Sequence, residues 1–426
     1  MFNSILDRFI STVIRQGNLR VTYADGKTKL YGGGNGKPVH LRFNTRRAER
    51  LVLFNPEFYL GHCYAEGEID LVEGDMYDLL EAIFTGNPDG QIEYTPWMKA
   101  IGALRYKLRH FRENNKLGRS RKNVQHHYDL TGALYDLFLD TDRQYSCAYF
   151  ETPETDLEQA QLAKKRHIAA KMVMNRPGLS VLDIGCGWGG MALYLARYLG
   201  ARVKGVTLSD EQLAIAKRRA AESGIADRLR FELQDYRHVD EKFDRIVSVG
   251  MFEHVGRPYY DEYFSKAAKL LKKDGVMLMH TIGRTDTPST TNPFIEKYIF
   301  PGGYIPSMSE VMPAIERSGL RITDIEVLRL HYAETLRAWR ERFMARREEA
   351  KKLYDEKFCR IWEFYLASSE SAFRWQNMVI FQFQLAHDQE AVPLTRDYIG
   401  EAEKSLKAIE EKIGTGAASF PQEAAE

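Results

Sequence analysis

From about residue 160 onward the chain alternates short apolar runs with amphipathic segments, and no other property of the sequence limits the possible folds so strongly. The segment 211–224 is one of the amphipathic stretches that predict helices. Such an alternation is typical of a parallel, doubly wound α/β sheet. Seven apolar runs predict the strands of this sheet: 180–185, 201–209, 228–235, 243–250, 275–283, 320–330 and 378–386.

A chain of 426 residues exceeds what one hydrophobic core usually covers, so two domains are expected. Residues 1–104 begin with an amphipathic helix, continue with alternating apolar residues around Asp25 and Gly26, and return to helix at 76–84. This pattern predicts a small α+β domain with β-hairpins. The expected remaining parts are a basic linker (105–125), a larger α/β domain (126–412) with a helical insertion (331–377), and a flexible tail (413–426).

The composition excludes several classes of protein. Lys plus Arg (60) nearly balances Asp plus Glu (59), which argues against a general nucleic-acid binder. The four cysteines form no CxxC pair, so neither disulfide bonds nor a metal site is expected, and a reducing cytoplasm fits best. No apolar stretch is long enough to span a bilayer. Eight of the residues 105–122 are Lys or Arg, which suits either a solvated linker or a surface for anionic lipid headgroups.

The stretch "VLDIGCGWGG" (181–190) is a strand that runs into a glycine-rich turn before a helix. A dinucleotide-binding fingerprint would be GxGxxG, with an acidic residue about 20 positions later to hold the ribose. Here the acid, Asp183, precedes the glycines, and the next strand ends in "TLS" without an acid. The order of residues therefore favours a nucleotide site of a different kind.

This arrangement resembles class I S-adenosylmethionine-dependent methyltransferases. The resemblance implies that the glycine-rich turn holds the methionine portion of S-adenosylmethionine, that "TLSDEQ" contacts the ribose, and that the end of the third strand meets the adenine. The residues implied are Asp183, Gly185, Gly187, Thr207, Leu208, Ser209, Gln212, Asp235 and Tyr236.

The predicted strand in "FDRIVSVGMFEHVG" (243–256) ends with a carboxylate and an imidazole, Glu253 and His254. In open α/β sheets, ligands bind in the crevice at the carboxyl ends of the strands. The position therefore indicates a site. We assign Glu253 to it, because an unpaired carboxylate beside a buried strand is costly, and leave His254 outside it as a packing or capping residue.

Four segments, 126–151, 248–256, 294–306 and 364–374, resemble cyclopropane-fatty-acyl-phospholipid synthases and the related mycolic acid cyclopropane synthases. The likeness runs from about residue 120 to 390. It implies a Rossmann-like class I methyltransferase fold with a helical insertion. It also implies transfer of the methyl group of S-adenosylmethionine to the cis double bond of an unsaturated phospholipid acyl chain, with a bound bicarbonate ion removing the proton that allows the cyclopropane ring to close.

The same resemblance assigns further residues. Glu253, His280 and Tyr365 would hold the bicarbonate ion with their side chains, and Cys147 and Ile282 with their backbone. His280 and Ile282 are two residues apart, so their side chains share one face of a strand. Further implied residues are Tyr128, Tyr145 and Ser146 in the cofactor site, and Phe294, Tyr298, Ile299 and Tyr304 in the wall of the acyl-chain channel.

We therefore expect a cytoplasmic enzyme, peripherally attached to the inner face of the cell membrane through contact with phospholipids, and homodimeric by resemblance. Two alternatives stay open. A sister methyltransferase would give methyl- or methylene-branched lipids, or methylate a small amine as some plant relatives do. A catalytically silent lipid-binding protein would keep the fold without the reaction. The sequence specifies neither the position of the double bond nor the headgroup.

Overall fold

The structure is a computed structural model that describes residues 2–86, 95–112 and 132–414. Its chain forms two compact units. The N-terminal unit comprises Met1–Arg112, Ser289–Pro301 and Tyr332–Met378, and the sheet unit comprises Glu113–Pro288, Gly302–His331 and Val379–Glu426. Tyr128, most of the predicted basic linker and nearly all of the predicted tail lie outside the described residues.

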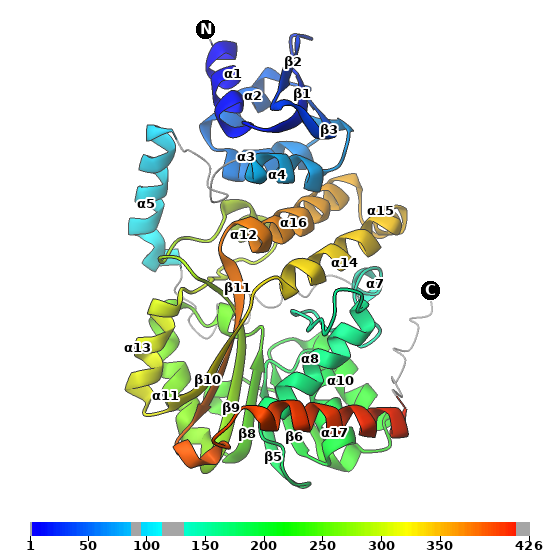
Figure 1. Cartoon of the computed structure of the whole chain (residues 1–426), viewed down its shortest axis with the longest axis vertical. Helices are drawn as coiled ribbons and strands as arrows, with labels where there is room; N and C mark the ends of the chain where they lie inside the picture. The colour runs from blue at the N-terminus through cyan, green and yellow to red at the C-terminus, as the bar shows by residue number, and fades with distance from the viewer. Residues whose placement is uncertain (1, 87–94, 113–131, 415–426) are drawn as a thin grey trace. The chain divides into compact units, whose positions relative to one another are not determined.

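The N-terminal unit contains a four-stranded sheet of order β2-β1-β3-β4, of which Figure 1 labels β1, β2 and β3. β1 and β2 form the predicted antiparallel hairpin, and Gly26 in its turn has a φ of +83°, which favours glycine. The strands are β1 (Gly17–Thr22), β2 (Thr28–Tyr31), β3 (Gly33–Phe43) and β4 (Ile69–Glu73). The helices are α1 (Phe2–Val13), α2 (Arg46–Phe54), α3 (Pro56–Ala65), α4 (Met76–Thr85), α5 (Pro96–Arg112), α12 (Pro293–Tyr298), α14 (His331–Ala345), α15 (Arg347–Leu353) and α16 (Glu356–Trp375).

The helical insertion belongs to this unit, where α16 packs against α3 and α4. Gly61 on α3 makes the close approach possible. A Cβ at Gly61 would lie 2.6 Å from the ring of Phe364 and 2.8 Å from that of Phe294, so no larger residue fits there without a shift.

The sheet unit is built on a seven-stranded sheet of order β10-β11-β9-β8-β5-β6-β7, and all seven predicted strands are present in it. The neighbours from β9 through β8, β5 and β6 to β7 pair in parallel, whereas β10 and β11 pair antiparallel. The predicted α/β fold is thus confirmed, with a sheet that is mostly rather than wholly parallel. The strands are β5 (Ser180–Ile184), β6 (Arg202–Thr207), β7 (Leu229–Leu233), β8 (Phe243–Val249), β9 (Leu271–Arg284), β10 (Arg321–Leu328) and β11 (Met378–Ala386).

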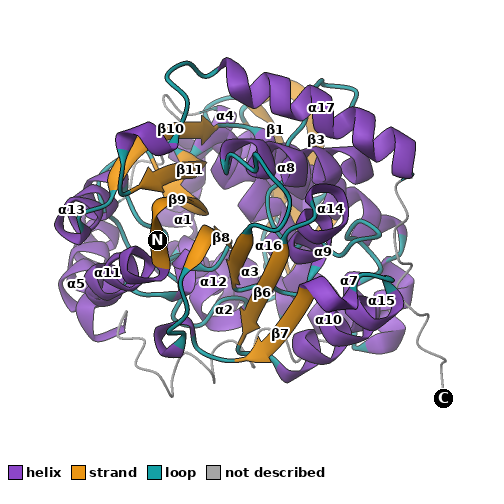
Figure 2. Cartoon of the chain, turned by 90° about the horizontal axis from the view of Figure 1, so that it is seen from below, coloured by secondary structure: helices purple, strands orange, loops and turns teal. Residues whose placement is uncertain are grey.

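Helices cover both faces of this sheet (Figure 2). One hydrophobic cluster joins α11 and α13 to the sheet, and a second joins α8, α9, α10 and α17 to it. The helices are α7 (Gly132–Tyr135), α8 (Leu157–Lys171), α9 (Gly190–Leu199), α10 (Asp210–Glu222), α11 (Tyr260–Leu270), α13 (Met308–Ser318) and α17 (Asp397–Ile413). Short 3₁₀ turns lie at Ala226–Arg228, Tyr236–His238, Phe252–His254, Arg257–Tyr259 and Gln389–Ala391.

None of the helices in the described part of the chain combines the length and the apolar character needed to cross a membrane.

Candidate active site

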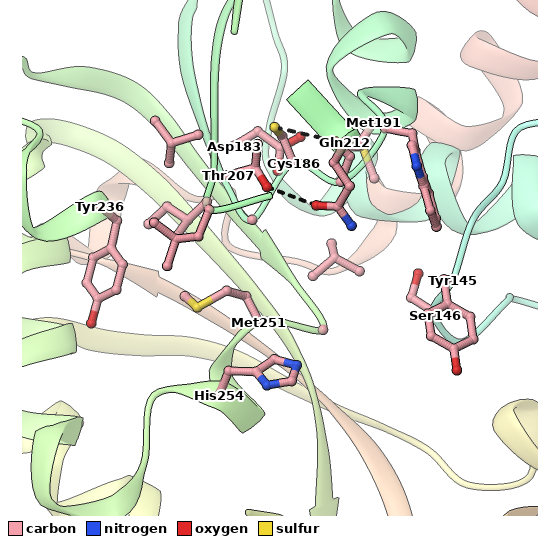
Figure 3. A pocket seen from close by; sticks show the side chains of 18 of the residues that line it. Tyr145, Ser146, Asp183, Cys186, Met191, Thr207, Gln212, Tyr236, Met251 and His254 are labelled. Carbon is pink, nitrogen blue, oxygen red and sulfur yellow. Dashed lines mark hydrogen bonds between the residues drawn. The ribbon is translucent and has the colours of Figure 1, made fainter. Parts of the chain in front are cut away.

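A cavity lies where β5, β6, β7 and β8 end, at the edge of the sheet where open α/β folds bind ligands (Figure 3). It collects side chains and backbone from the ends of these strands and from the segment before Cys147. Ten of the predicted cofactor residues line it: Tyr145, Ser146, Asp183, Gly185, Gly187, Thr207, Leu208, Gln212, Asp235 and Tyr236.

The glycine-rich turn lines this cavity with backbone atoms, because its glycines have no side chains. Gly185 and Gly187 have φ angles of +79° and +54°, the left-handed region that glycine adopts without strain. At Gly185 a Cβ would also lie 2.9 Å from the side chain of Met251. The turn therefore requires glycine at Gly185 for two reasons, and it leaves the backbone open to a ligand.

Asp183 places a buried carboxylate on the cavity wall. Its side chain is 2% exposed, and its Oδ2 atom has no hydrogen-bond partner among the described residues. Burial raises the pKa of Asp183 to about 7, and the positive charge of nearby Lys164 opposes that rise. An unpaired buried carboxylate oxygen is the feature expected where a cationic ligand group is to be held.

Thr207 and Gln212 are held together in the wall by a 2.8 Å hydrogen bond from the Thr207 hydroxyl to the Gln212 Oε1 atom. Ser209 does not line the cavity. It caps α10 by accepting a hydrogen bond from the backbone N–H of Gln212, and so it positions that residue. The predicted contact of Ser209 with a ribose stays a prediction.

Asp235 and Tyr236 stand at the end of β7. Both Asp235 carboxylate oxygens accept hydrogen bonds from the Arg237 guanidinium, at 2.9 and 2.7 Å. The pKa of Asp235 is lowered, because these hydrogen bonds outweigh the opposing effect of burial. The ring of Tyr236 packs edge-on against Tyr263, with centroids 5.4 Å apart.

The structure corrects the placement of His254, which sequence reasoning left outside the site. His254 lines the cavity together with Met251. Burial lowers the pKa of His254 to about 4, so its imidazole is neutral at physiological pH. The 3₁₀ turn Phe252–His254 is responsible, because it rotates successive side chains away from the alternation of a strand. Trp188 and Met191, which follow the glycine-rich turn, are further lining residues that the sequence pattern did not single out.

Glu253 lies in the turn that follows β8, and His280 lies on the neighbouring strand β9. β8 pairs with β9 so that Val249 lies opposite His280, and the carboxylate of Glu253 reaches β9 by accepting a 2.6 Å hydrogen bond from the backbone N–H of Ile282. The structure thus brings Glu253 into direct contact with Ile282, and His280 lies two residues earlier on the same strand. The amide of Ile282, predicted to face the ion, donates to Glu253.

Each of these two side chains keeps one buried polar atom without a partner among the described residues: Oε2 of Glu253 and Nε2 of His280. Burial raises the pKa of Glu253 to about 7, an effect that the Ile282 hydrogen bond partly offsets. Burial also lowers the pKa of His280 well below its usual value, so the imidazole is neutral. A carboxyl that titrates near neutrality and a neutral imidazole thus both have capacity to hold a small polar ligand.

The other two predicted catalytic residues, Cys147 and Tyr365, lie in different units of the chain. Cys147 is 1% exposed and follows the wall residue Ser146, and its thiol donates to the Ala148 carbonyl at 3.2 Å. Tyr365 belongs to the N-terminal unit, where its ring contacts Phe300 and Trp362. Its part in the site therefore stays a prediction.

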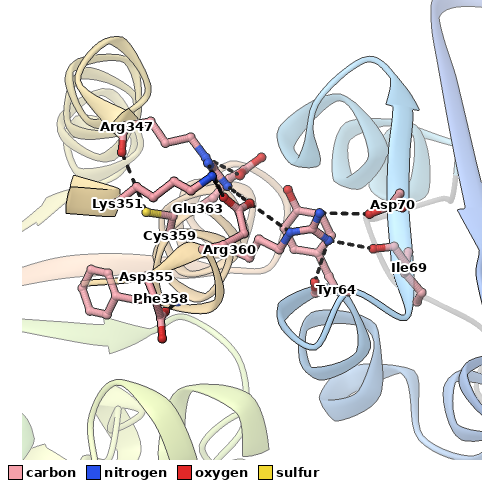
Figure 4. Close-up of polar contacts among 12 residues, drawn as sticks. Tyr64, Ile69, Asp70, Arg347, Lys351, Asp355, Phe358, Cys359, Arg360 and Glu363 are labelled. Carbon is pink, nitrogen blue, oxygen red and sulfur yellow. Dashed lines mark hydrogen bonds and ion pairs between the residues drawn. The ribbon is translucent and has the colours of Figure 1, made fainter. Parts of the chain in front are cut away.

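The helix that carries Tyr365 is fixed firmly within the N-terminal unit (Figure 4). Arg360, just over one turn before Tyr365, donates to the carbonyls of Tyr64 and Ile69 at 3.1 and 3.2 Å and pairs with the Asp70 carboxylate at 3.0 Å. Planar guanidinium groups suit such multiple contacts. The position of α16 thus depends on residues nearly 300 positions earlier in the chain.

The residues predicted to wall an acyl channel are divided between the units. Phe294 is fully buried in the N-terminal unit against Phe364, and Tyr298 hydrogen-bonds His62 at 2.7 Å. Ile299 is 2% exposed in the same unit. Tyr304 lies in the sheet unit, where its hydroxyl donates to Glu310 at 2.7 Å. Their contact with an acyl chain stays a prediction.

The strand order, with β11 inserted between β9 and β10, and the glycine-rich turn after the first parallel strand together define a class I methyltransferase fold. The solved structure of mycolic acid cyclopropane synthase CmaA1 complexed with SAH and CTAB matches with a TM-score of 0.59 and 36% identity. The match covers 62% of this chain and 97% of that one.

The sequence comparisons specify the family. The model of the mycolic acid cyclopropane synthetase family matches residues 115–383, and a second model, described as a domain of unknown function, matches residues 5–89. The chain is 36% identical to the cyclopropane-fatty-acyl-phospholipid synthase of Escherichia coli K12, over 81% of this chain and 87% of that protein. It is also 36% identical to a probable fatty acid methyltransferase of Pseudomonas putida, over 75% of this chain and 80% of that protein.

The chain therefore belongs to the mycolic acid cyclopropane synthetase family and is an S-adenosylmethionine-dependent methyltransferase. The cavity fits this cofactor. The unpaired Oδ2 of Asp183 matches an ammonium group, the bare turn at Gly185 and Gly187 admits a close approach, and Thr207 and Gln212 offer polar groups at the end of β6. These residues would hold the cofactor.

Proposed function

We propose that this enzyme converts the cis double bond of an unsaturated acyl chain in a membrane phospholipid into a cyclopropane ring. The methyl group comes from S-adenosylmethionine, and a bicarbonate ion held beside Glu253 and His280 acts as the base. The printed name of the E. coli relative, a cyclopropane-fatty-acyl-phospholipid synthase, supports the choice of product and substrate.

One observation carries the proposal: two buried polar atoms, Glu253 Oε2 in the turn after β8 and His280 Nε2 on the neighbouring strand β9, are left without partners among the described residues. Leaving such atoms unpaired costs about 1–3 kcal/mol each, and more for a charged group. A site that keeps both is poised for a ligand that pairs with both. Bicarbonate has a hydroxyl that can donate to a carboxylate and an oxygen that can accept from an imidazole N–H.

The chemistry explains why a held ion is needed. S-adenosylmethionine supplies an electrophilic methyl group, and addition of that group to an alkene leaves a positive charge on the neighbouring carbon. Ring closure then requires loss of a proton from the added methyl group, with the C–H electron pair forming the last ring bond. Glu253 and His280 orient the base for this step, and the buried surroundings of both residues keep water away.

A second candidate has support from one comparison. The relative from Pseudomonas putida is named a probable fatty acid methyltransferase, a name that leaves the product open. A methyl-branched product would require a hydride donor. A methylene-branched product would require a 1,2-hydride shift that moves the positive charge to the methyl-bearing carbon, after which the added methyl group loses a proton. Either outcome would use the same cofactor cavity.

A lipid surface is the partner that we propose for α5. Trp97, Leu104 and Tyr106 on this helix are 39%, 59% and 41% exposed, and Lys99 and Lys107 are exposed beside them. Trp97 and Leu104 are seven residues apart and so lie on one helix face. Exposed apolar and aromatic side chains with lysines are typical of helices that lie in a membrane interface.

The reaction is tested by incubating the full chain with S-adenosylmethionine and vesicles of unsaturated phospholipid, and analysing the acyl chains by mass spectrometry. A ring product gains one CH₂ and resists mild hydrogenation. A methylene-branched product gains the same mass but takes up hydrogen, and a methyl-branched product gains two further hydrogens. No mass change, together with no binding of S-adenosylmethionine in a calorimetric titration, would support a silent lipid-binding protein.

Membrane contact is tested separately by vesicle flotation. We expect the full chain to float with vesicles that contain anionic lipid, and the double variant Trp97→Ser/Leu104→Ser to float less. Equal flotation of the two proteins would remove α5 from the lipid-contacting surface. The predicted homodimer is measured independently by sedimentation velocity.

A further inference from the structure

Strand β11 carries two amides in an otherwise apolar run. Its sequence "MVIFQFQLA" places Gln382 and Gln384 on one face, and both side chains are fully buried. Buried amides are costly unless their donors and acceptors are satisfied. β11 lies beside β9, the strand that carries His280, so the contacts of Gln382 reach the candidate active site.

Gln382 links His280 to Lys171. The Nε2 atom of Gln382 lies 3.2 Å from Nδ1 of His280, and its Oε1 atom accepts a 3.1 Å hydrogen bond from the Lys171 ammonium. An ammonium group only donates, so the carbonyl end of the amide must face Lys171. The NH₂ end must then face His280, and this fixes which way the hydrogen bond to the imidazole runs.

Lys171 is itself firmly placed. It is fully buried on α8 and pairs with Asp324 at 3.2 Å and with Glu326 at 2.8 Å, both on β10. These two ion pairs fix the position of the ammonium group. The orientation of the Gln382 amide therefore depends on an ion-paired lysine rather than on a group that can switch between donor and acceptor.

The consequence for His280 concerns its tautomer. In a neutral imidazole one nitrogen carries the proton and the other carries a lone pair. The NH₂ group of Gln382 needs an acceptor, so Nδ1 supplies the lone pair and the proton resides on Nε2. Nε2 is the atom that has no partner among the described residues. His280 thus presents a donor to the site and has no lone pair left for proton abstraction.

We propose that Gln382, held by Lys171, is a positioning residue that locks His280 in the Nε2–H tautomer, so that His280 donates a hydrogen bond to a bound oxyanion and does not act as the base. The inference rests on the proposed function for the identity of the oxyanion. The tautomer itself is a property of the chain alone and is open to measurement without turnover.

The decisive measurement is NMR of the full chain with ¹⁵N-labelled histidine, in which His280 is assigned by the loss of its signals in a His280→Asn variant. We expect the proton on Nε2 and an unprotonated Nδ1. A neutral ring with the proton on Nδ1, or a doubly protonated ring at pH 7.5, would overturn the proposal. If the tautomer is as expected while the vesicle assay yields no ring product, the proposed function fails and the positioning role of Gln382 stands.

The variant Gln382→Glu tests the cause. It keeps the shape but replaces the donor toward Nδ1 by an acceptor, so we expect the proton to move to Nδ1. The turnover number should fall about ten- to a hundredfold, the range for partners that orient functional histidines, with little change in the KM for S-adenosylmethionine. An unchanged tautomer with an unchanged turnover number would contradict the proposal.

Gln384→Glu is the matched control. Gln384 is equally buried on the same face of β11, but it donates to the Lys171 carbonyl and the Tyr398 hydroxyl instead of to His280. We expect it to lower thermal stability about as much as Gln382→Glu while leaving the proton on Nε2. A shift of the His280 tautomer in both variants would show a general disturbance of the core and count against the role of Gln382.

Discussion

Two buried histidines of the sheet unit differ in how completely their surroundings satisfy them. His167 on α8 has both ring nitrogens on carboxylates, with Nε2 2.7 Å from Glu326 and Nδ1 2.7 Å from Glu403. His280 on β9 has one nitrogen on the amide of Gln382 and the other without a partner among the described residues. Both histidines are less than 5% exposed, so burial alone does not distinguish them.

The pKa values of the two imidazoles move in opposite directions for this reason. Burial lowers both, but hydrogen bonds to Glu326 and Glu403 more than compensate at His167 and raise its pKa, whereas nearby positive charges at His280 add to the lowering. A fully paired polar cluster stabilises the fold. A partly paired cluster leaves a polar atom that can form a hydrogen bond with a ligand.

The largest effect is expected at the incompletely paired groups of the candidate active site, Glu253 and His280. Glu253→Gln removes the carboxylate that would accept from the ion. Because that ion is the proposed base, we expect turnover to fall by about 10²–10⁴, the range that a positioned general base contributes. In the wild type, activity should rise with pH through about 7, because the carboxylate is the accepting form and its pKa is raised to about 7. The vesicle assay over pH 5.5–8.5 measures both effects.

Glu341→Gln serves as the control for that variant, because Glu341 is 57% exposed on α14 and belongs to the N-terminal unit. Its turnover and its pH profile should match those of the wild type. Wild-type turnover in Glu253→Gln would remove Glu253 from the site.

The next largest effect is expected at the fully paired groups around His167. Lys171→Met leaves Asp324 and Glu326 without their buried ammonium, and we expect a loss of about 2–4 kcal/mol in the free energy of unfolding. The loss is limited because each carboxylate keeps another cation: Arg396 beside Asp324 at 3.2 Å, and His167 beside Glu326. Urea unfolding followed by circular dichroism measures it. Lys217→Met, at an exposed position on α10, should change the free energy of unfolding by less than about 0.5 kcal/mol.

The sequence predicts only part of the difference between the surroundings of His167 and those of His280. The seven strands and the glycine-rich turn follow from local patterns, since periodicity and glycine spacing depend on neighbouring residues. The pairing of His280 with Gln382 joins residues 102 positions apart, and that of Lys171 with Gln382 joins residues 211 apart. The insertion of β11 beside β9 creates both contacts, and no local pattern specifies it.

One signal in the sequence did mark this region. Two glutamines in the apolar run "FQFQLA" contradict a purely hydrophobic strand, and a buried amide requires partners from elsewhere in the fold. The position of His254 was missed for a different reason, because a 3₁₀ turn after β8 cannot be told from a continued strand by alternation alone. Likewise, α16 packs on α3 and α4 through contacts with distant residues, such as those of Arg360.

A third prediction extends the comparison to the cofactor cavity, where Asp183 is another carboxylate with a buried oxygen that lacks a partner among the described residues. Asp183→Asn should weaken S-adenosylmethionine binding about tenfold at pH 8, which corresponds to roughly 1.4 kcal/mol. The difference from the wild type should shrink below pH 7, because the pKa of Asp183 is raised to about 7 and the wild-type carboxyl then loses its charge too. Isothermal titration calorimetry at both pH values measures this. Asp240→Asn, at an exposed position, should bind like the wild type at each pH.

The smallest expected effect is a gain in the free energy of unfolding of Glu253→Gln. Its sign is opposite to that expected for Lys171→Met, so it distinguishes an incompletely paired buried group from a fully paired one. The pKa of Glu253 is raised from 4.5 to about 7 in the folded chain, so between these values the unfolded state binds fewer protons than the folded state. The free energy of unfolding of the wild type therefore falls as pH rises through this window.

Glu253→Gln carries no such penalty, and we expect it to be more stable than the wild type by about 1 kcal/mol at pH 8. The gain is no larger because the buried amide is itself incompletely paired, which costs the variant part of the advantage. At pH 4.5 the folded wild-type carboxyl is neutral, so its ionisation penalty of about 3 kcal/mol is largely absent and the variant should be less stable than the wild type by about 2 kcal/mol. Urea unfolding at the two pH values measures it, and a loss of stability at pH 8, as expected for Lys171→Met, would mean that Glu253 belongs with the fully paired groups.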